Sequence, residues 1–223
     1  MAEPRIYLTD RVSVENGGKH IDESEFPGRQ GRLAFVFLMI DRHRSVSRDD
    51  LISAIWGLDP PNEVDSALGS ILSKLRGSLR KVGLGVEQTC IEVQRGCVEF
   101  RLPPNIWIDV EAATNAVDEA EGALRSHDLQ RGWGLSNVVV AIMRRPFLPN
   151  EEAPWIERLR ARFRATLARG LHCLSIISAD RGEFPLAVQY AAEIVDLQPF
   201  QETAYQHLMR LHARMGNGAE ARG

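Results

Sequence analysis

The chain has 223 residues, of which 44% are hydrophobic, so it can bury the core of one or two domains. Its formal net charge is −3, which excludes the strongly basic balance that by itself indicates nucleic-acid binding. The longest apolar run, residues 33–40, is far shorter than the ~20 residues of a membrane-spanning helix. We therefore expect a cytoplasmic protein that makes no membrane contact. The three cysteines form no CxxC pair, so no zinc or redox site is predicted.

Short strands are predicted at both ends of the first half. Ile6–Leu8 and Val12–Glu15 alternate apolar and polar residues, and Asn16-Gly17-Gly18 predicts a tight turn before a third short strand. Residues 89–104 predict two further strands around Gln94-Arg95-Gly96, which together form a hairpin.

Two helices are predicted between these strands. Residues 28–44 indicate a buried helix, and residues 45–57 indicate a second one. Ser47 is suited to cap the start of the second helix and Gly57 to end it. A stiff loop follows, because the two prolines in residues 58–62 fix the backbone.

A third helix is predicted over residues 62–83. Its apolar residues recur every three or four positions on one face: Val64, Leu68, Ile71, Leu72, Leu75, Leu79 and Val82. Its other face carries small and basic residues: Ser66, Gly69, Ser70, Ser73, Lys74, Arg76, Gly77, Arg80 and Lys81. Small residues allow a duplex to approach closely, and lysine and arginine neutralise phosphates. The helix alone is more typical of a solvated surface. The order of strands, three helices and a hairpin favours a winged helix, whose third helix enters the major groove.

The second half has a different character. Beyond Pro103-Pro104 strand signals vanish, so the chain is divided into residues 1–104 and residues 105–223. An internal repeat of 34 residues relates these pairs: Gly182 and Gly216, Leu174 and Leu208, Ala179 and Ala213, Ala187 and Ala221. Ala187, Ala191, Ile194 and Pro199 have the spacing of a tetratricopeptide helix. We therefore expect a mainly α-helical protein with a small β part, and a tetratricopeptide-like domain that is incomplete at its C-terminal end. A generic helical hairpin is the alternative.

The first half contains five short motifs in order: Arg29-Gln30-Gly31-Arg32, Val46-Ser47-Arg48-Asp49-Asp50-Leu51, Ile55-Trp56-Gly57, Pro60-Pro61 and Leu72-Ser73-Lys74-Leu75-Arg76. These motifs resemble those of the SARP-type transcriptional regulators. In the second half, residues 108–113, 144–163 and 197–217 resemble the bacterial transcriptional activator domain that follows the winged helix in that family.

The resemblance implies a regulator that binds double-stranded DNA, with a helical domain for dimer or partner contacts. It makes the third helix the recognition helix, and it implies that the loop before that helix can face RNA polymerase. The DNA-contacting residues are then predicted to be Ser66, Gly69, Ser70, Ser73 and Lys74 in the major groove, Arg76, Arg80 and Lys81 at phosphates, Arg95 at the wing tip, and Arg48. We expect a homodimer without enzymatic activity or cofactor.

Acidic residues depart from this pattern. Glu63 and Asp65 lie near the expected phosphates, and residues 1–104 hold 14 basic and 15 acidic residues. Five arginines within residues 29–48 compensate locally, so we expect weak binding by the monomer and stronger binding by a dimer or with polymerase. The alternative is a scaffold that no longer reads DNA, whose helical groove binds a protein or a small signalling ligand.

Other candidate sites have simpler interpretations. His207 and His212 are five residues apart, which is unsuitable for a metal pair on a helix. Glu151 and Glu152 are expected at a helix start, where acids suit the dipole, and not as catalytic carboxylates. The five arginines of residues 157–169 predict a solvated helix face. The tryptophans are expected to fill helix junctions: Trp107, Trp133 and Trp155.

Overall fold

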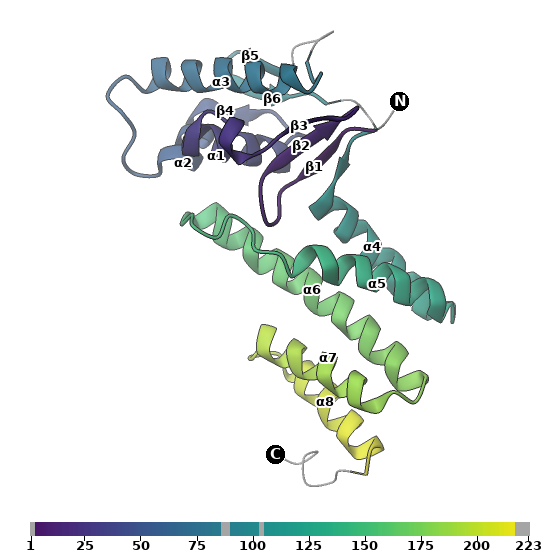
Figure 1. The fold of residues 1–223 in the computed structure, drawn as a ribbon. Helices are drawn as coiled ribbons and strands as arrows, with labels where there is room; N and C mark the ends of the chain where they lie inside the picture. Colours follow the sequence, from purple (N-terminus) through teal and green to yellow (C-terminus); the bar gives the residue numbers. More distant parts are fainter. Residues whose placement is uncertain (1–2, 86–89, 103–104, 217–223) are drawn as a thin grey trace. The chain divides into compact units, whose positions relative to one another are not determined.

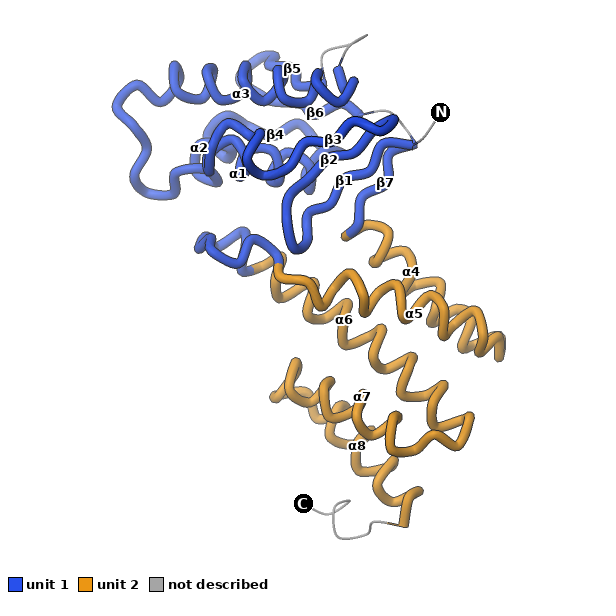
Figure 2. Tube along the Cα trace, viewed as in Figure 1, with its two compact units in different colours: residues 1–109, 147–157 blue, residues 110–146, 158–223 orange. Residues whose placement is uncertain are grey.

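A computed structural model describes residues 3–85, 90–102 and 105–216. The chain forms two compact units, which Figure 2 distinguishes by colour. The first unit comprises Met1–Asp109 and Phe147–Glu157, and the second comprises Val110–Pro146 and Arg158–Gly223. None of the helices in the described ranges combines the length and the apolar character that a bilayer crossing requires.

A four-stranded sheet in the order β3-β2-β1-β7 begins the first unit. Its strands are β1 (Arg5–Tyr7), β2 (Ser13–Asn16), β3 (Lys19–Ile21) and β7 (Trp107–Ile108). The first three strands pair antiparallel, as the alternating residues predict, whereas β7 pairs parallel to β1. The strand β7 lies within the part predicted to be helical, and two residues are too few to carry a detectable alternation.

Three helices and a second sheet complete the winged-helix architecture of this unit (Figure 1). The helices are α1 (Gly28–Ile40), α2 (Arg48–Trp56) and α3 (Val64–Lys81), preceded by a short 3-10 helix, η1 (Glu23–Glu25). The second sheet has the order β4-β6-β5, with β4 (Val46–Ser47), β5 (Ile91–Gln94) and β6 (Cys97–Phe100). The β5–β6 hairpin is therefore the wing.

Local sequence signals fix the ends of α2 and the tip of the wing. The Ser47 hydroxyl accepts a hydrogen bond of 3.0 Å from the Asp50 amide, and Gly57 ends the helix with a φ of 63°. Arg95 and Gly96 form a two-residue hairpin loop, and both have positive φ, at 51° and 77°. Such a loop matches the right-handed twist of the paired strands. The predicted cap and hairpin are both confirmed.

The second unit consists of helices joined by short connections. They are α4 (Asp109–Arg125), α5 (Leu129–Met143), α6 (Pro154–Asp180), α7 (Phe184–Leu197) and α8 (Glu202–Arg214), with the first residue of α4 and the first turn of α6 assigned to the first unit. Their arrangement confirms the expected mainly α-helical fold with a tetratricopeptide-like part.

The 34-residue repeat has a structural counterpart. Gly182 and Gly216 follow α6 and α8 with φ of 78° and 80°, and the amide of each donates to a carbonyl three residues earlier, at 3.2 Å. The two glycines therefore end equivalent helices in the same way. Ala187 and Ala191 of α7 are fully buried against α8, as their small size predicts. The fourth repeat position, Ala221, lies outside the described residues.

The division of the chain into domains of residues 1–104 and 105–223 stays a prediction. The compact units divide after Asp109, and the first unit also includes Phe147–Glu157. Pro103-Pro104, which suggested the boundary, lie outside the described residues.

Candidate nucleic-acid interface

The helix α3 has one buried face and one exposed face. Four leucines of the apolar stripe are almost completely buried: Leu68, Leu72, Leu75 and Leu79. The opposite face exposes all five residues predicted for the major groove: Ser66, Gly69, Ser70, Ser73 and Lys74. A Cβ atom added at Gly69 or Gly77 would meet nothing within 4 Å. These two glycines are therefore not required by packing within the described fold.

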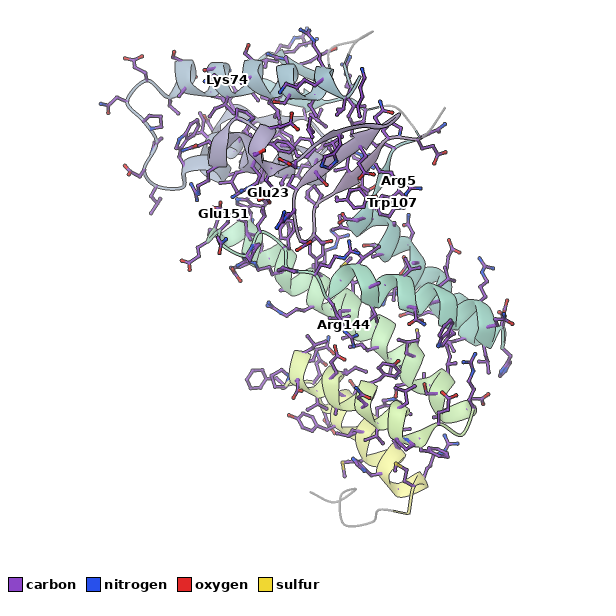
Figure 3. All side chains as sticks on the ribbon, viewed as in Figure 1. Arg5, Glu23, Lys74, Trp107, Arg144 and Glu151 are labelled. Carbon is purple, nitrogen blue, oxygen red and sulfur yellow. The ribbon has the colours of Figure 1, made fainter. Side chains whose placement is uncertain are left out.

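Some basic side chains on and beside this face form ion pairs with acidic residues of the protein, and others do not. Lys74, Arg80 and Arg95 are exposed and make no salt bridge within the described ranges (Figure 3 labels Lys74). The Lys81 ammonium lies 3.4 Å from a carboxylate oxygen of Glu25. Only some of the basic residues predicted to contact DNA are therefore without an ion pair among the described residues.

Arg76 has a structural contact that the sequence did not indicate. Its Nε donates a hydrogen bond of 2.9 Å to the Ile91 carbonyl, and the side chain is half-buried. Arg76 therefore ties α3 to the first strand of the wing, and that contact occupies one edge of its guanidinium. A substitution of Arg76 disturbs this contact as well as any phosphate contact.

Arg48 also has a partner. Its guanidinium forms an ion pair of 2.6 Å with Asp65, one of the two acids that depart from the expected pattern. The pair links the start of α2 to the start of α3 and offsets the charge of Asp65. Glu63 is exposed just before α3 begins.

The wing presents its positive charge at the tip. Arg95 is exposed in the two-residue loop, whereas Arg101 at the far end of the hairpin forms ion pairs with Glu92 and Glu99. The Ser45 hydroxyl and the Arg101 guanidinium lower the pKa of Glu99 by stabilising its charged form. These contacts leave Arg95 as the cation that the hairpin offers to a ligand.

Two of the five arginines expected to offset the acidic residues of the first half instead bind an acidic residue of the protein. Arg29 and Arg32 both contact Glu151, whose side chain is only 3% exposed, at 2.7 and 2.8 Å. The expectation that Glu151 lies at a helix start, where an acid suits the dipole, is therefore wrong, because α6 begins only at Pro154 and Glu151 is buried within the first unit. Sequence reasoning missed this cluster because its members are more than 100 residues apart.

The tryptophans occupy three different environments. Trp155 packs against Phe37, with ring centroids 5.2 Å apart, and fills a helix junction as expected. Trp107 instead lies on β7, edge-on to the ring of Tyr7. Trp133 is 45% exposed, with the Arg181 guanidinium 5.9 Å from its ring centroid. The expectation that Trp107 and Trp133 fill helix junctions is therefore wrong, because Trp107 lies on a strand and Trp133 is nearly half exposed.

The arginine-rich part of α6 is partly engaged. Arg158, Arg162 and Arg164 are exposed, as a solvated face predicts. Arg169 instead forms two hydrogen bonds with the Glu121 carboxylate, at 2.7 and 2.8 Å, and a third with Asp118. The two acids raise the pKa of Arg169 and keep it charged.

A pocket of about 260 Å³, which several polar side chains line, lies within the second unit. It is lined by Glu121, Ala168, Arg169, His172, Ile194, Gln198, Thr203, Ala204 and His207. The His207 Nε2 lies 2.8 Å from the Ser175 hydroxyl, which donates its own proton to the Ala187 carbonyl. His207 must therefore donate from Nε2. Burial lowers the pKa of His207 to about 4, and the charges of His172 and Arg210 add to the shift.

No three histidine, cysteine, aspartate or glutamate side chains among the residues that the structure places are grouped so that they could hold a metal ion.

Comparisons with known proteins agree on the kind of protein that this chain is similar to. A family model described as bacterial transcriptional activator domain matches residues 108–223. The regulatory protein AfsR of Streptomyces coelicolor is 25% identical over 192 residues, and that of Streptomyces griseus is 23% identical over 194 residues. Each alignment covers 86% of this chain and 19% of the relative, so the chain spans about a fifth of their length.

The fold has a close counterpart among solved structures. Mycobacterium tuberculosis EmbR, solved in complex with a low-affinity phosphopeptide, superposes with a TM-score of 0.84 at 15% sequence identity. The match covers 98% of this chain and 57% of that chain. At this identity the likeness establishes the fold, while the family match and the two sequence relatives confirm the resemblance that the sequence motifs carry.

Proposed function

The chain belongs to the bacterial transcriptional activator domain family, and on that premise we propose that it is a sequence-specific DNA-binding regulator of transcription without enzymatic activity. In this proposal α3 enters the major groove, the wing tip reaches an adjacent groove, and the second unit makes dimer or partner contacts. The protein acts in the cytoplasm, where bacterial promoters are.

The observation that carries the proposal is the exposed face of α3. It combines small residues that leave room for a duplex with Lys74 and Arg80, which make no ion pair in the described part of the chain, and Arg95 lies at the wing tip. Lysine and arginine bind phosphates or guanine edges, and serine hydroxyls bind either bases or phosphates. A surface of this composition beside a wing supports base reading in the major groove.

The loop between α2 and α3 supports a polymerase contact. Every residue from Gly57 to Glu63 is exposed, and Leu58 is a large apolar side chain with no cover in the described fold. An exposed leucine in a proline-stiffened loop suits a protein surface better than a duplex. We therefore assign this loop to RNA polymerase and α3 to DNA.

Selection of a random duplex library on the purified protein at ~100 mM salt tests the proposal, because nonspecific phosphate binding is already weakened there. Enrichment of a direct or inverted repeat is the expected result, and the half-site spacing gives the geometry of the dimer. An unenriched library from folded protein would contradict the proposal.

The recovered site then allows a test of the assigned residues. Lys74→Ala combined with Arg80→Ala should weaken binding roughly 10- to 100-fold and reduce the salt dependence by about 0.9 per lost phosphate contact. Arg11→Ala combined with Lys19→Ala is the matched control, since both side chains are exposed on the N-terminal sheet side of the unit. Equal losses in the two double variants would show that only net charge matters. Arg76 is unsuitable for this test because of its contact with Ile91.

The scaffold alternative is favoured by one observation, the pocket of the second unit. Arg169 and Glu121 line it together with hydrogen-bonding side chains, which suits a peptide or a small polar ligand. Selection of displayed peptides on the full chain would test it, with Arg169→Ala compared with the exposed Arg164→Ala. A pocket-dependent peptide together with an unenriched duplex library would favour the scaffold.

A further inference from the structure

The first unit is completed by a segment that lies far beyond it in the sequence. Phe147–Glu157 connects α5 to α6, yet it packs within the unit that carries the candidate DNA interface. We propose that two residues of this segment, Glu151 and Trp155, are positioning residues for DNA binding, which act by holding α3 in place. The proposal rests on the proposed function of α3.

Glu151 is bound from two sides. Its carboxylate accepts hydrogen bonds from Arg29 Nε at 2.7 Å and from Arg32 at 2.8 Å, both in the first turns of α1. A carboxylate that is 3% exposed depends on such partners, because burial of an unpaired charge is costly. Glu151 therefore fixes the Arg29 side chain and supplies one of the two carboxylate partners of Arg32 at the start of α1.

A chain of hydrogen bonds continues from Arg32 to the C-terminal end of α3. Arg32 also binds Glu23 of η1, at 3.3 Å, and Glu23 accepts from the Val12 amide. At the other end of η1, the Glu25 carbonyl accepts from the buried Ser78 hydroxyl of α3, at 2.8 Å. Because η1 has only three residues, its position is tied to both partners. Glu23 and Glu151 are both labelled in Figure 3.

A second connection reaches the N-terminal end of α3. The Trp155 indole N–H donates a hydrogen bond of 3.1 Å to the Ala54 carbonyl of α2, and its ring packs on Phe37 of α1. The first residue of α2, Arg48, forms the ion pair with Asp65 of α3. Trp155 therefore holds the helix that contacts the start of α3, while Glu151 acts on its end.

Both ends of α3 are thus linked to one segment outside the winged helix. A recognition helix must keep its side chains in register with base edges, and small displacements weaken direct readout more than phosphate contacts. Loss of Glu151 or of the Trp155 hydrogen bond should therefore reduce specific binding more than nonspecific binding.

The test uses the full chain with Glu151→Gln and Trp155→Phe. The exposed neighbour Glu152→Gln controls for charge, and Trp133→Phe controls for the ring substitution. Affinity for the selected operator and for unrelated duplex is measured at a temperature at which every variant is fully folded. Trp155→Phe keeps most of the packing, so it remains informative if Glu151→Gln fails to fold.

We expect a five- to thirty-fold loss of operator affinity for each test variant, with less than twofold change in nonspecific binding and an unchanged salt dependence. The controls should lie within twofold of the original protein. Hydrogen exchange of α3 amides should be faster in the test variants than in the controls. A merely structural role would lower the unfolding midpoint and leave the ratio of specific to nonspecific affinity unchanged.

Two outcomes separate this inference from the proposed function. If folded test variants keep their operator affinity and the hydrogen-exchange rates of their α3 amides, the positioning role is overturned. The proposal that the protein is a DNA-binding regulator is then unaffected. Absence of any operator for the original protein would instead refute the proposed function, and with it the DNA-binding role of these residues.

Discussion

Within each of the two units, the stabilising contacts span a different range of the sequence. In the first unit, buried or partly buried polar contacts join residues about 100 or more positions apart: Thr9 to Asp109, Ala54 to Trp155, and Arg29 to Glu151. In the second unit, α7 packs against the adjacent α8, and the buried Ser175 hydroxyl binds a carbonyl only 12 positions away. The first unit therefore depends on a few distant side chains, whereas the second depends on packing between neighbouring helices.

The largest effect is expected at Trp155. Trp155→Ala removes a buried ring and its hydrogen bond to Ala54, so the free energy of unfolding should fall by about 3–5 kcal/mol. Denaturant unfolding followed by circular dichroism measures it. Trp133→Ala, at a half-exposed site in the second unit, should cost less than about 1 kcal/mol. Similar losses for the two variants would break the contrast between the units.

The next effect is expected at Asp109, which is fully buried. Its carboxylate accepts hydrogen bonds from the amides of Leu8 and Thr9 and from the Thr9 hydroxyl, at 2.7–3.0 Å. Asp109→Asn places an amide group against these donors and should cost about 2–4 kcal/mol in calorimetric unfolding. Asp128→Asn, at the exposed cap of α5, should change stability by less than about 0.5 kcal/mol, since asparagine caps helices equally well. Equal changes would show that this distant contact is dispensable.

In the second unit, His207 should make stability depend on pH. The pKa of His207 is lowered to about 4 in the folded protein, against about 6.5 in an unfolded chain, so the unfolded chain binds more protons between these values. Its contribution is therefore present above pH 6.5 and is lost as the pH falls toward 4, by at most about 2 kcal/mol at pH 4.5 because solvent screens this partly exposed group.

Urea midpoints at pH 7 and pH 4.5 measure this dependence. His207→Gln should reduce the difference between the two midpoints, whereas the exposed His43→Gln should leave it as in the original protein. A His207 variant with the full pH dependence would assign the effect to other groups.

The smallest effect concerns two helical glycines. A Cβ atom at Gly170 of α6 would lie 2.8 Å from a methyl carbon of Val139 on α5, whereas one at Gly134 would meet nothing within 4 Å. Gly170→Ala should therefore cost about 1–2 kcal/mol through overpacking. Gly134→Ala should stabilise by up to about 1 kcal/mol. Opposite signs in thermal unfolding would support close helix packing as the basis of the second unit, and equal signs would contradict it.

The elements that the sequence predicts are those with local causes. Ser47 and Gly57 mark the ends of α2, and the wing tip follows from Arg95-Gly96. The exposed face of α3 follows from its periodicity, because four buried leucines determine which residues point away. The location of the candidate interface could therefore be predicted without the structure.

What the sequence could not predict are the partners of charged residues. Arg48, Arg76 and Glu151 look like exposed charges in the sequence, and each is bound to a residue brought close only by the fold. Charge patterns give the composition of a surface but not the pairing within it. The predicted set of DNA-contacting cations is consequently larger than the set that has no ion pair or hydrogen bond among the described residues.

The position of Phe147–Glu157 has a consequence for how such a gene can be rearranged. A crossover near codon 104 would join this winged helix to a foreign helical part and leave Glu151 and Trp155 behind. Arg29, Arg32 and Ala54 would then lose the partners they have here. Exchange of the helical part would succeed only when the incoming sequence carries an acid and an indole at equivalent positions. A hybrid gene of that kind would therefore need a matching segment 147–157 as well as a matching winged helix.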